Sequence, residues 1–88
     1  MPYILQDHRP VIDKAISELP TVMTDGEMNY AITQIMDRRL QFHGTNYATI
    51  NMLIGVLECA KMELYRRIAA PYEDMKIAIN GDAYHDAQ

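Results

Sequence analysis

The sequence predicts an all-α protein, and three observations support that prediction. Apolar residues recur at helical spacing in three segments, a proline or glycine follows each segment, and capping residues precede the second and the third. We expect two short helices packed on a long, proline-kinked third helix, all within one domain that spans residues 1–88.

The first helix is predicted to be short. Residues 1–8 are expected to form an extended arm, and Pro10 stands where a first-turn proline is tolerated. Five apolar residues then share one helix face before Pro20 ends the helix, so it spans residues 10–19. These five are Val11, Ile12, Ala15, Ile16 and Leu19.

The second helix is predicted over residues 25–43. Thr24 and Glu27 have the spacing of a capping box, in which a hydroxyl and a carboxylate satisfy each other's backbone amides. Gly44 is placed as a C-terminal stop. An apolar stripe follows the helix between these signals, formed by Met28, Ala31, Ile32, Ile35, Met36 and Phe42.

The third helix is apolar on two sides, which predicts two neighbours for it. Thr45 or Asn46 can cap its start. Gly55 interrupts an apolar middle, where a missing side chain lets another helix approach. One side is expected to face the first two helices, through Ile50, Leu53, Leu57, Leu64 and Ile68. The other side is assigned to a second subunit, through Met52, Val56 and Cys59.

Pro71 leaves two interpretations of the C-terminal part. Proline followed by Tyr-Glu-Asp reads well as a fresh helix start. Met75 and Ile79 nevertheless keep the angular phase of the preceding apolar stripe, so we favour one kinked helix that ends at Asn80. Residues 82–88 are predicted to be a polar tail.

Self-association is predicted from composition. Hydrophobic residues make up 49% of the 88 residues, with seven Met and six Tyr. A chain this short buries only about 60–65% of its unfolded surface, so one small core cannot use all of this apolar material. We expect a dimer or a higher even-numbered homo-oligomer, and the sequence leaves that number open.

Charge and cysteine content exclude several classes of protein. The net charge of −4 disfavours nucleic-acid binding, which needs a basic field. No apolar run reaches the 18–20 or so residues of a membrane span. Cys59 is the single cysteine, and the N-terminal sequence lacks the pattern of a signal peptide, so we expect a cytoplasmic protein.

Three sequence blocks resemble a known family. The chain starts with MPYI, the second helix contains GEMNYAIT, and the C-terminal half contains LYRR, PYE, a lysine and NGD followed by tyrosine. Together they resemble a family of very small helical proteins of unknown function found in prokaryotes and phages. The resemblance implies no catalytic residues. It implies a setting in which compact oligomers bind a host signal or a host protein.

A candidate ligand site lies along the third helix. If the helix continues through Pro71, cations and tyrosines share one face, where rings stack on a planar base and cations meet phosphate. The plainer interpretation is that the tyrosines only pack and that Arg66 pairs with Glu63 at the surface. The candidate binding residues are Lys61, Tyr65, Arg66, Tyr72 and Lys76, with Glu58 on the same face.

No catalytic or metal-binding motif is present. The Glu-x-x-His pairs of di-iron bundles are absent, and the three histidines fall in an arm, a helix end and a tail. Cys59 lies in the apolar middle of a helix, which does not suit a nucleophile. We expect no enzymatic activity, no metal and no cofactor.

The leading functional hypothesis is therefore a non-catalytic helical oligomer that binds a small anionic ligand. A nucleotide or nucleotide signal held between subunits, as in a phage-type sequestering protein, fits the candidate residues. The alternative is a protein-interaction module, such as a viral inhibitor or accessory factor, whose partner docks on Met- and Tyr-rich surface.

Overall fold

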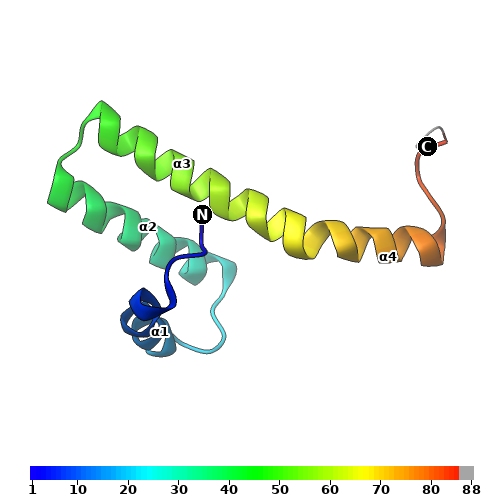
Figure 1. Ribbon diagram of the computed structural model, residues 1–88, viewed down its shortest axis with the longest axis horizontal. Coiled ribbons are helices and arrows are strands. Elements are labelled where there is room, and N and C mark those ends of the chain that lie inside the picture. The colour runs from blue at the N-terminus through cyan, green and yellow to red at the C-terminus, as the bar shows by residue number, and fades with distance from the viewer. Residues whose placement is uncertain (86–88) are drawn as a thin grey trace.

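The protein is all-α, as predicted. The computed structural model describes residues 1–85 and contains no strand among them (Figure 1). Its helices are α1 (Arg9–Ser17), α2 (Asp25–His43) and a continuous 34-residue helix. The continuous helix consists of α3 (Tyr47–Leu64), the π-helical segment η2 (Tyr65–Ala69) and α4 (Ala70–Asn80).

Residues 1–5 of the N-terminal arm have no regular secondary structure, and the amide of Ile4 bonds to the carbonyl of Pro2 at 3.0 Å. A 3₁₀ turn, η1 (Gln6–His8), leads directly into α1, so the expected extended arm over residues 1–8 is too long. Arg9 donates two hydrogen bonds to the carbonyl of Ile4, from Nε at 3.1 Å and Nη2 at 2.8 Å. These bonds fold the arm back on the start of α1.

The end of α1 also differs from the prediction. The helix stops at Ser17 rather than Leu19, because the amides of Glu18 and Leu19 bond to carbonyls only three residues earlier. Such i→i−3 bonds tighten the last turn into 3₁₀ geometry. In addition, α1 makes no close backbone approach to α2 or α3. It is therefore not packed on the third helix as expected.

Both ends of α2 agree with the prediction. The Thr24 hydroxyl accepts a hydrogen bond from the Glu27 amide at 3.1 Å, and Glu27 Oε1 accepts one from the Thr24 amide at 2.8 Å. Gly44 ends the helix with φ +87°, a conformation that residues with a Cβ rarely adopt. Local sequence signals therefore decide this element.

The small core lies where α2 and α3 form an antiparallel hairpin (Figure 1). Asn46 caps α3 by accepting hydrogen bonds from the amide and the hydroxyl of Thr49 at 3.0 and 3.1 Å. Thr49 and Leu53 are the buried residues of the described chain. Met52 was assigned to a second subunit, but its sulfur lies 3.9 Å from Arg39 Nη1 of α2.

The long helix continues through Pro71, which confirms the kinked interpretation. The Ala70 amide bonds to the Tyr65 carbonyl five residues back, which is π-helical pairing. Pro71 has no amide hydrogen, and its ring needs space beside the carbonyl of Arg67 four residues earlier. The wider π turn provides that space, so the helix bends without breaking.

The π segment changes which residues share a face. A π turn contains more residues than an α turn, so side chains after Ala69 are rotated relative to an uninterrupted α-helix. Leu64, Met75 and Ile79 were predicted to share one helix face on the assumption that each residue rotates by about 100° about the helix axis. The π segment breaks that regular rotation, so Leu64 does not share a face with Met75 and Ile79.

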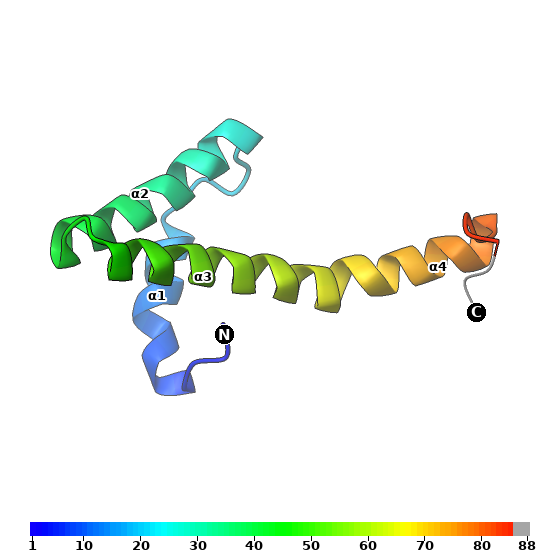
Figure 2. The same ribbon diagram turned by 90° about the horizontal axis from the view of Figure 1, so that it is seen from above.

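One chain does not enclose a core of ordinary size. Its radius of gyration is 17.5 Å, whereas a compact chain of this length has about 12 Å. Its accessible surface is 8138 Å², against about 5,300 Å² for a folded monomer of this mass. Figure 2 shows the reason, because α4 extends away from the other helices.

The predicted polar tail lies partly outside the described residues. Asp82 accepts a hydrogen bond from the amide of Tyr84 at 2.8 Å, which shapes the turn after α4. Residues 86–88, the rest of the tail, are outside the part of the chain that the structure describes.

Removing the capping box should destabilise α2. Thr24→Ala deletes the acceptor of the Glu27 amide and should lower the free energy of unfolding by about 1 kcal/mol, as at other capped helices. Urea unfolding followed by circular dichroism measures this change. Thr21→Ala, outside the helix, is the matched control and should change stability by less than about 0.5 kcal/mol. Equal effects of the two variants would contradict the role of the cap.

Candidate functional site

The cations of the predicted ligand site have partners within their own helix. Lys61 Nζ lies 3.0 Å from Glu58 Oε1, and Arg66 Nη2 lies 2.7 Å from Glu63 Oε1. Both cationic side chains remain well exposed, at 71% and 66%. The plainer interpretation of Arg66, pairing with Glu63, is therefore what the single chain shows.

The two tyrosines of the predicted site belong to different local groups. Tyr65 donates a long hydrogen bond of 3.4 Å to Glu73 Oε2. Tyr72 instead has the ammonium of Lys76 5.5 Å from its ring centroid, a cation–π contact within α4. In the single chain the five predicted residues thus form paired groups along a bent rod.

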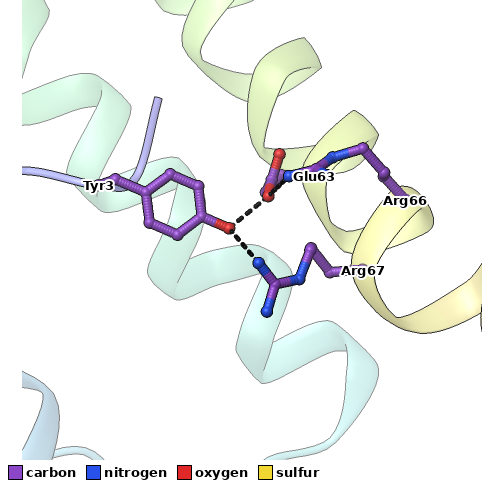
Figure 3. Close-up of polar contacts among 4 residues, drawn as sticks. All are labelled: Tyr3, Glu63, Arg66 and Arg67. Atoms are coloured by element: carbon purple, nitrogen blue, oxygen red, sulfur yellow. Dashed lines mark hydrogen bonds and ion pairs between the residues drawn. The ribbon is translucent and has the colours of Figure 1, made fainter.

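A cluster that sequence reasoning missed joins the N-terminal arm to the long helix (Figure 3). The Tyr3 hydroxyl donates to Glu63 Oε1 and accepts from Arg67 Nη1 at 3.4 Å. Because Arg66 donates to the same Glu63 oxygen, four side chains form one connected network. The tyrosine and the acid are 60 residues apart, so no sequence spacing announces their contact.

The network shifts the acidity of its members. The pKa of Glu63 lies below its ordinary value, first because of the Tyr3 hydrogen bond and then because of the Arg66 hydrogen bond. The pKa of Arg66 is raised, chiefly by its hydrogen bond to Glu63. Because the carboxyl pKa is lower in the folded protein than in the unfolded chain, the network stabilises the fold at pH values above the unfolded pKa of Glu63. That contribution is lost as the pH falls through the lower, folded-state pKa.

A second feature that the sequence did not reveal is an apolar groove between α1 and the N-terminal half of α2. Its volume is about 640 Å³. Its walls are almost wholly apolar and include side chains from both helices and from the connecting segment. Among the lining residues are Ile16, Leu19, Met23, Tyr30, Ala31 and Ile35.

The groove follows from how α1 and α2 are placed. Sequence periodicity indicated an apolar face on each helix, and we expected both faces to be covered by the third helix. Because α1 approaches neither α2 nor α3 closely, the two faces leave a gap instead of a packed core. Ile16 and Ile35 are each more than half exposed there.

Other kinds of site find no support in the described residues. Over residues 1–85, no three His, Cys, Asp or Glu side chains lie close enough together to hold a metal ion. Cys59 was expected in an apolar setting, yet it is exposed in the single chain. None of the described helices combines the length and the apolar character that crossing a membrane requires.

Comparison with known proteins identifies the family. The model of a domain of unknown function, DUF6899, matches residues 1–83. The chain belongs to the DUF6899 family. No curated protein and no solved structure matches it. Membership agrees with the resemblance to a family of unknown function, and it assigns no activity to any residue.

Tyr3→Phe should raise the pKa of Glu63 toward its ordinary value, because the strongest stabilising hydrogen bond of the carboxylate is removed. A carbon-detected NMR titration of the Glu63 carboxyl measures the shift. Tyr47→Phe is the matched control, since Tyr47 is 82% exposed at the start of α3. An unchanged Glu63 pKa in Tyr3→Phe would show that the arm is not held by this contact.

Proposed function

We propose that the protein is a non-catalytic binding protein whose working form is a homo-oligomer. The observation that carries this proposal is the exposed surface, about 8138 Å² for a chain that would expose about 5,300 Å² if it were compact. The excess is about 2,800 Å² per chain, or about 5,600 Å² for two chains, which is at the upper end of the total area that obligate subunit interfaces bury.

The excess surface is apolar in character, which favours a permanent association. Large hydrophobic side chains are exposed on every helix, and several are more than half exposed. Monomeric soluble proteins rarely expose contiguous apolar patches of more than a few hundred Å². A second copy of the chain is the simplest source of cover, because each copy carries the same uncovered faces.

For the ligand we propose a small anion, such as a nucleotide or nucleotide signal. Lys61 and Arg66 are held by exposed (i, i+3) ion pairs, which contribute little because water and salt screen the charges. A phosphate group can displace partners held so weakly. Tyr65 and Tyr72 are each 55% exposed and offer ring faces for stacking.

Assembly is needed for such a ligand to be enclosed. In the single chain the five candidate residues lie along one continuous helix, and the N-terminal arm borders that helix beside Arg66 without enclosing the other four. Ligand pockets are concave and bury most of the ligand surface. The proposal therefore places the ligand between subunits, where a second chain supplies the missing wall.

The alternative, a protein-interaction module such as a viral inhibitor or accessory factor, uses the same exposed apolar surface. The present pairing of Lys61 and Arg66 with acids favours it. Self-association, however, already accounts for that surface.

A prokaryotic or phage setting and a cytoplasmic location belong to the proposal as well. The cytoplasmic location is proposed because the exposed thiol of Cys59 suits a reducing compartment.

Sedimentation should show a dimer or larger assembly at micromolar concentration. Val56→Glu should shift the protein toward monomers, because an unpaired carboxylate in an interface costs several kcal/mol. Val56 is half exposed in the single chain, so that chain should tolerate the substitution. Asn51→Glu adds the same charge at an exposed polar position of α3 and is the control. A wild-type monomer at micromolar concentration would sink the proposal.

Calorimetry against mono-, di- and cyclic nucleotides tests the ligand class. Binding should be weakened by about 1–3 kcal/mol in Arg66→Ala or Lys76→Ala, since charge-assisted hydrogen bonds are lost. Tyr72→Phe should cost less than Tyr72→Ala if the ring stacks on a base. Lys14→Ala, on α1, is the control cation. An oligomer that binds no nucleotide more tightly than millimolar would favour the protein-interaction alternative.

A further inference from the structure

The groove between α1 and α2 is unfilled by the chain that forms it. The two helices make no close backbone approach to each other, and about 640 Å³ of space separates their apolar side chains. Interiors of folded proteins are close-packed, with few voids larger than a water molecule. The apolar walls of this groove therefore lack, in the single chain, the packing partners that a core supplies.

Helix α4 has an apolar stripe that its own chain leaves uncovered. Within residues 1–85 it approaches no element other than η2, from which it continues. Tyr72, Met75 and Ile79 lie at i, i+3 and i+7 and form one apolar stripe on its surface. All three are about half exposed or more. This spacing is that of the anchor residues by which an amphipathic helix enters an apolar groove.

The stripe and the groove match in length and in charge. From Tyr72 to Ile79 the stripe is about 10 Å long, and α1, one wall of the groove, is about 13 Å long. Lys76 borders the stripe, whereas Asp74 lies on the other side of α4. The acidic side chain of Glu27 lines the groove, so the charged groups at the contact are of opposite sign.

The groove cannot receive the α4 of its own chain. The groove lies between α1 and α2, whereas α4 extends away from both helices along the long axis, which measures 50 Å, and a continuous helix joins α3 to α4 (Figures 1 and 2). Bending that helix back would break the backbone hydrogen bonds that η2 preserves. The occupant must be supplied by another molecule.

We infer that the apolar stripe of α4 docks in the α1–α2 groove of a second copy of the chain. Each copy carries one groove and one α4, so a two-fold axis across the rod satisfies both at once and closes the dimer. The excess surface of about 2,800 Å² per chain is large enough for such an exchange. The inference rests on the proposed homo-oligomer, because it names the surfaces through which the copies associate. It assigns Tyr72 and Lys76 to the subunit contact, which leaves Lys61, Tyr65 and Arg66 for the proposed ligand.

Site-specific cross-linking tests the docked pair directly. Cys59→Ser removes the native thiol, and Ile16→Cys and Ile79→Cys are then made in separate chains on that background. Mixed and treated with a short bismaleimide, the two chains should give a cross-linked heterodimer as the main product. Ile54→Cys, an equally exposed isoleucine on α3 outside the groove lining, is the control partner and should give at least tenfold less.

A paired substitution gives an independent readout on the intact chain. Met75→Lys places a charge in the stripe and should raise the dissociation constant of the assembly at least tenfold in sedimentation. Ile77→Lys adds the same charge on the opposite side of α4, about 160° from Met75 and Ile79, and should change that constant less than about twofold. Because α4 touches no other helix of its chain, circular dichroism should report equal helix content in both variants.

The outcomes separate this inference from the proposed function. If the wild-type protein is monomeric, both fail. If it is oligomeric but Met75→Lys and Ile77→Lys behave alike, the docking inference fails and the homo-oligomer stands. Cross-linking of position 79 to position 54 rather than to position 16 would place α4 on α3 of the partner, and would also overturn the inference.

Discussion

The unbroken helix through Pro71 is the constraint on which the rest of this structure depends. Because the amide of Ala70 pairs with the carbonyl of Tyr65, the backbone passes the proline without ending the helix. The cost of ending it would have been unpaired backbone groups at two new helix termini. The result is a rod of 34 residues whose last third lies beyond the reach of α1 and α2.

The extended helix explains why the single chain buries so few side chains. Only the α2–α3 hairpin buries side chains, at Thr49 and Leu53, among the residues that the structure describes. A hydrophobic side chain gains stability in proportion to the area removed from water, so the exposed apolar residues of α1 and α4 contribute little in one chain. Association is the arrangement that lets them contribute, and it makes folding and assembly parts of one equilibrium.

The charged network around Glu63 holds the N-terminal arm, whereas Arg66 was predicted either to bind a ligand or only to pair with Glu63. Tyr3 links the arm to α3 and η2, so the arginine pair helps to hold the N-terminus as well as to present positive charge. The contacts are exposed, and surface pairs of this kind add little stability. Their value is positional, because they hold the arm beside the bend where a second chain and any anionic ligand are proposed to meet.

The residues themselves were enough to predict the all-α class, the three helices and both ends of α2. The ends of the helices are set by hydrogen bonds between residues close in sequence: the capping box at Thr24, the stop at Gly44 and the cap at Asn46. Residue types and their spacing are therefore enough to predict these ends. The continuation through Pro71 was also predicted, from apolar spacing that assumed a uniform α-helix, although η2 changes that spacing in the structure.

Tertiary structure alone decided what those helices face. The Tyr3–Glu63 contact joins residues 60 positions apart, and the π segment rotates α4 relative to the phase that a uniform helix would have. The groove depends on how far α1 stands from α2, which no periodicity encodes. Local hydrogen bonds specify an element, whereas the position of one element against another depends on all the surfaces that must be covered, including those of a second chain.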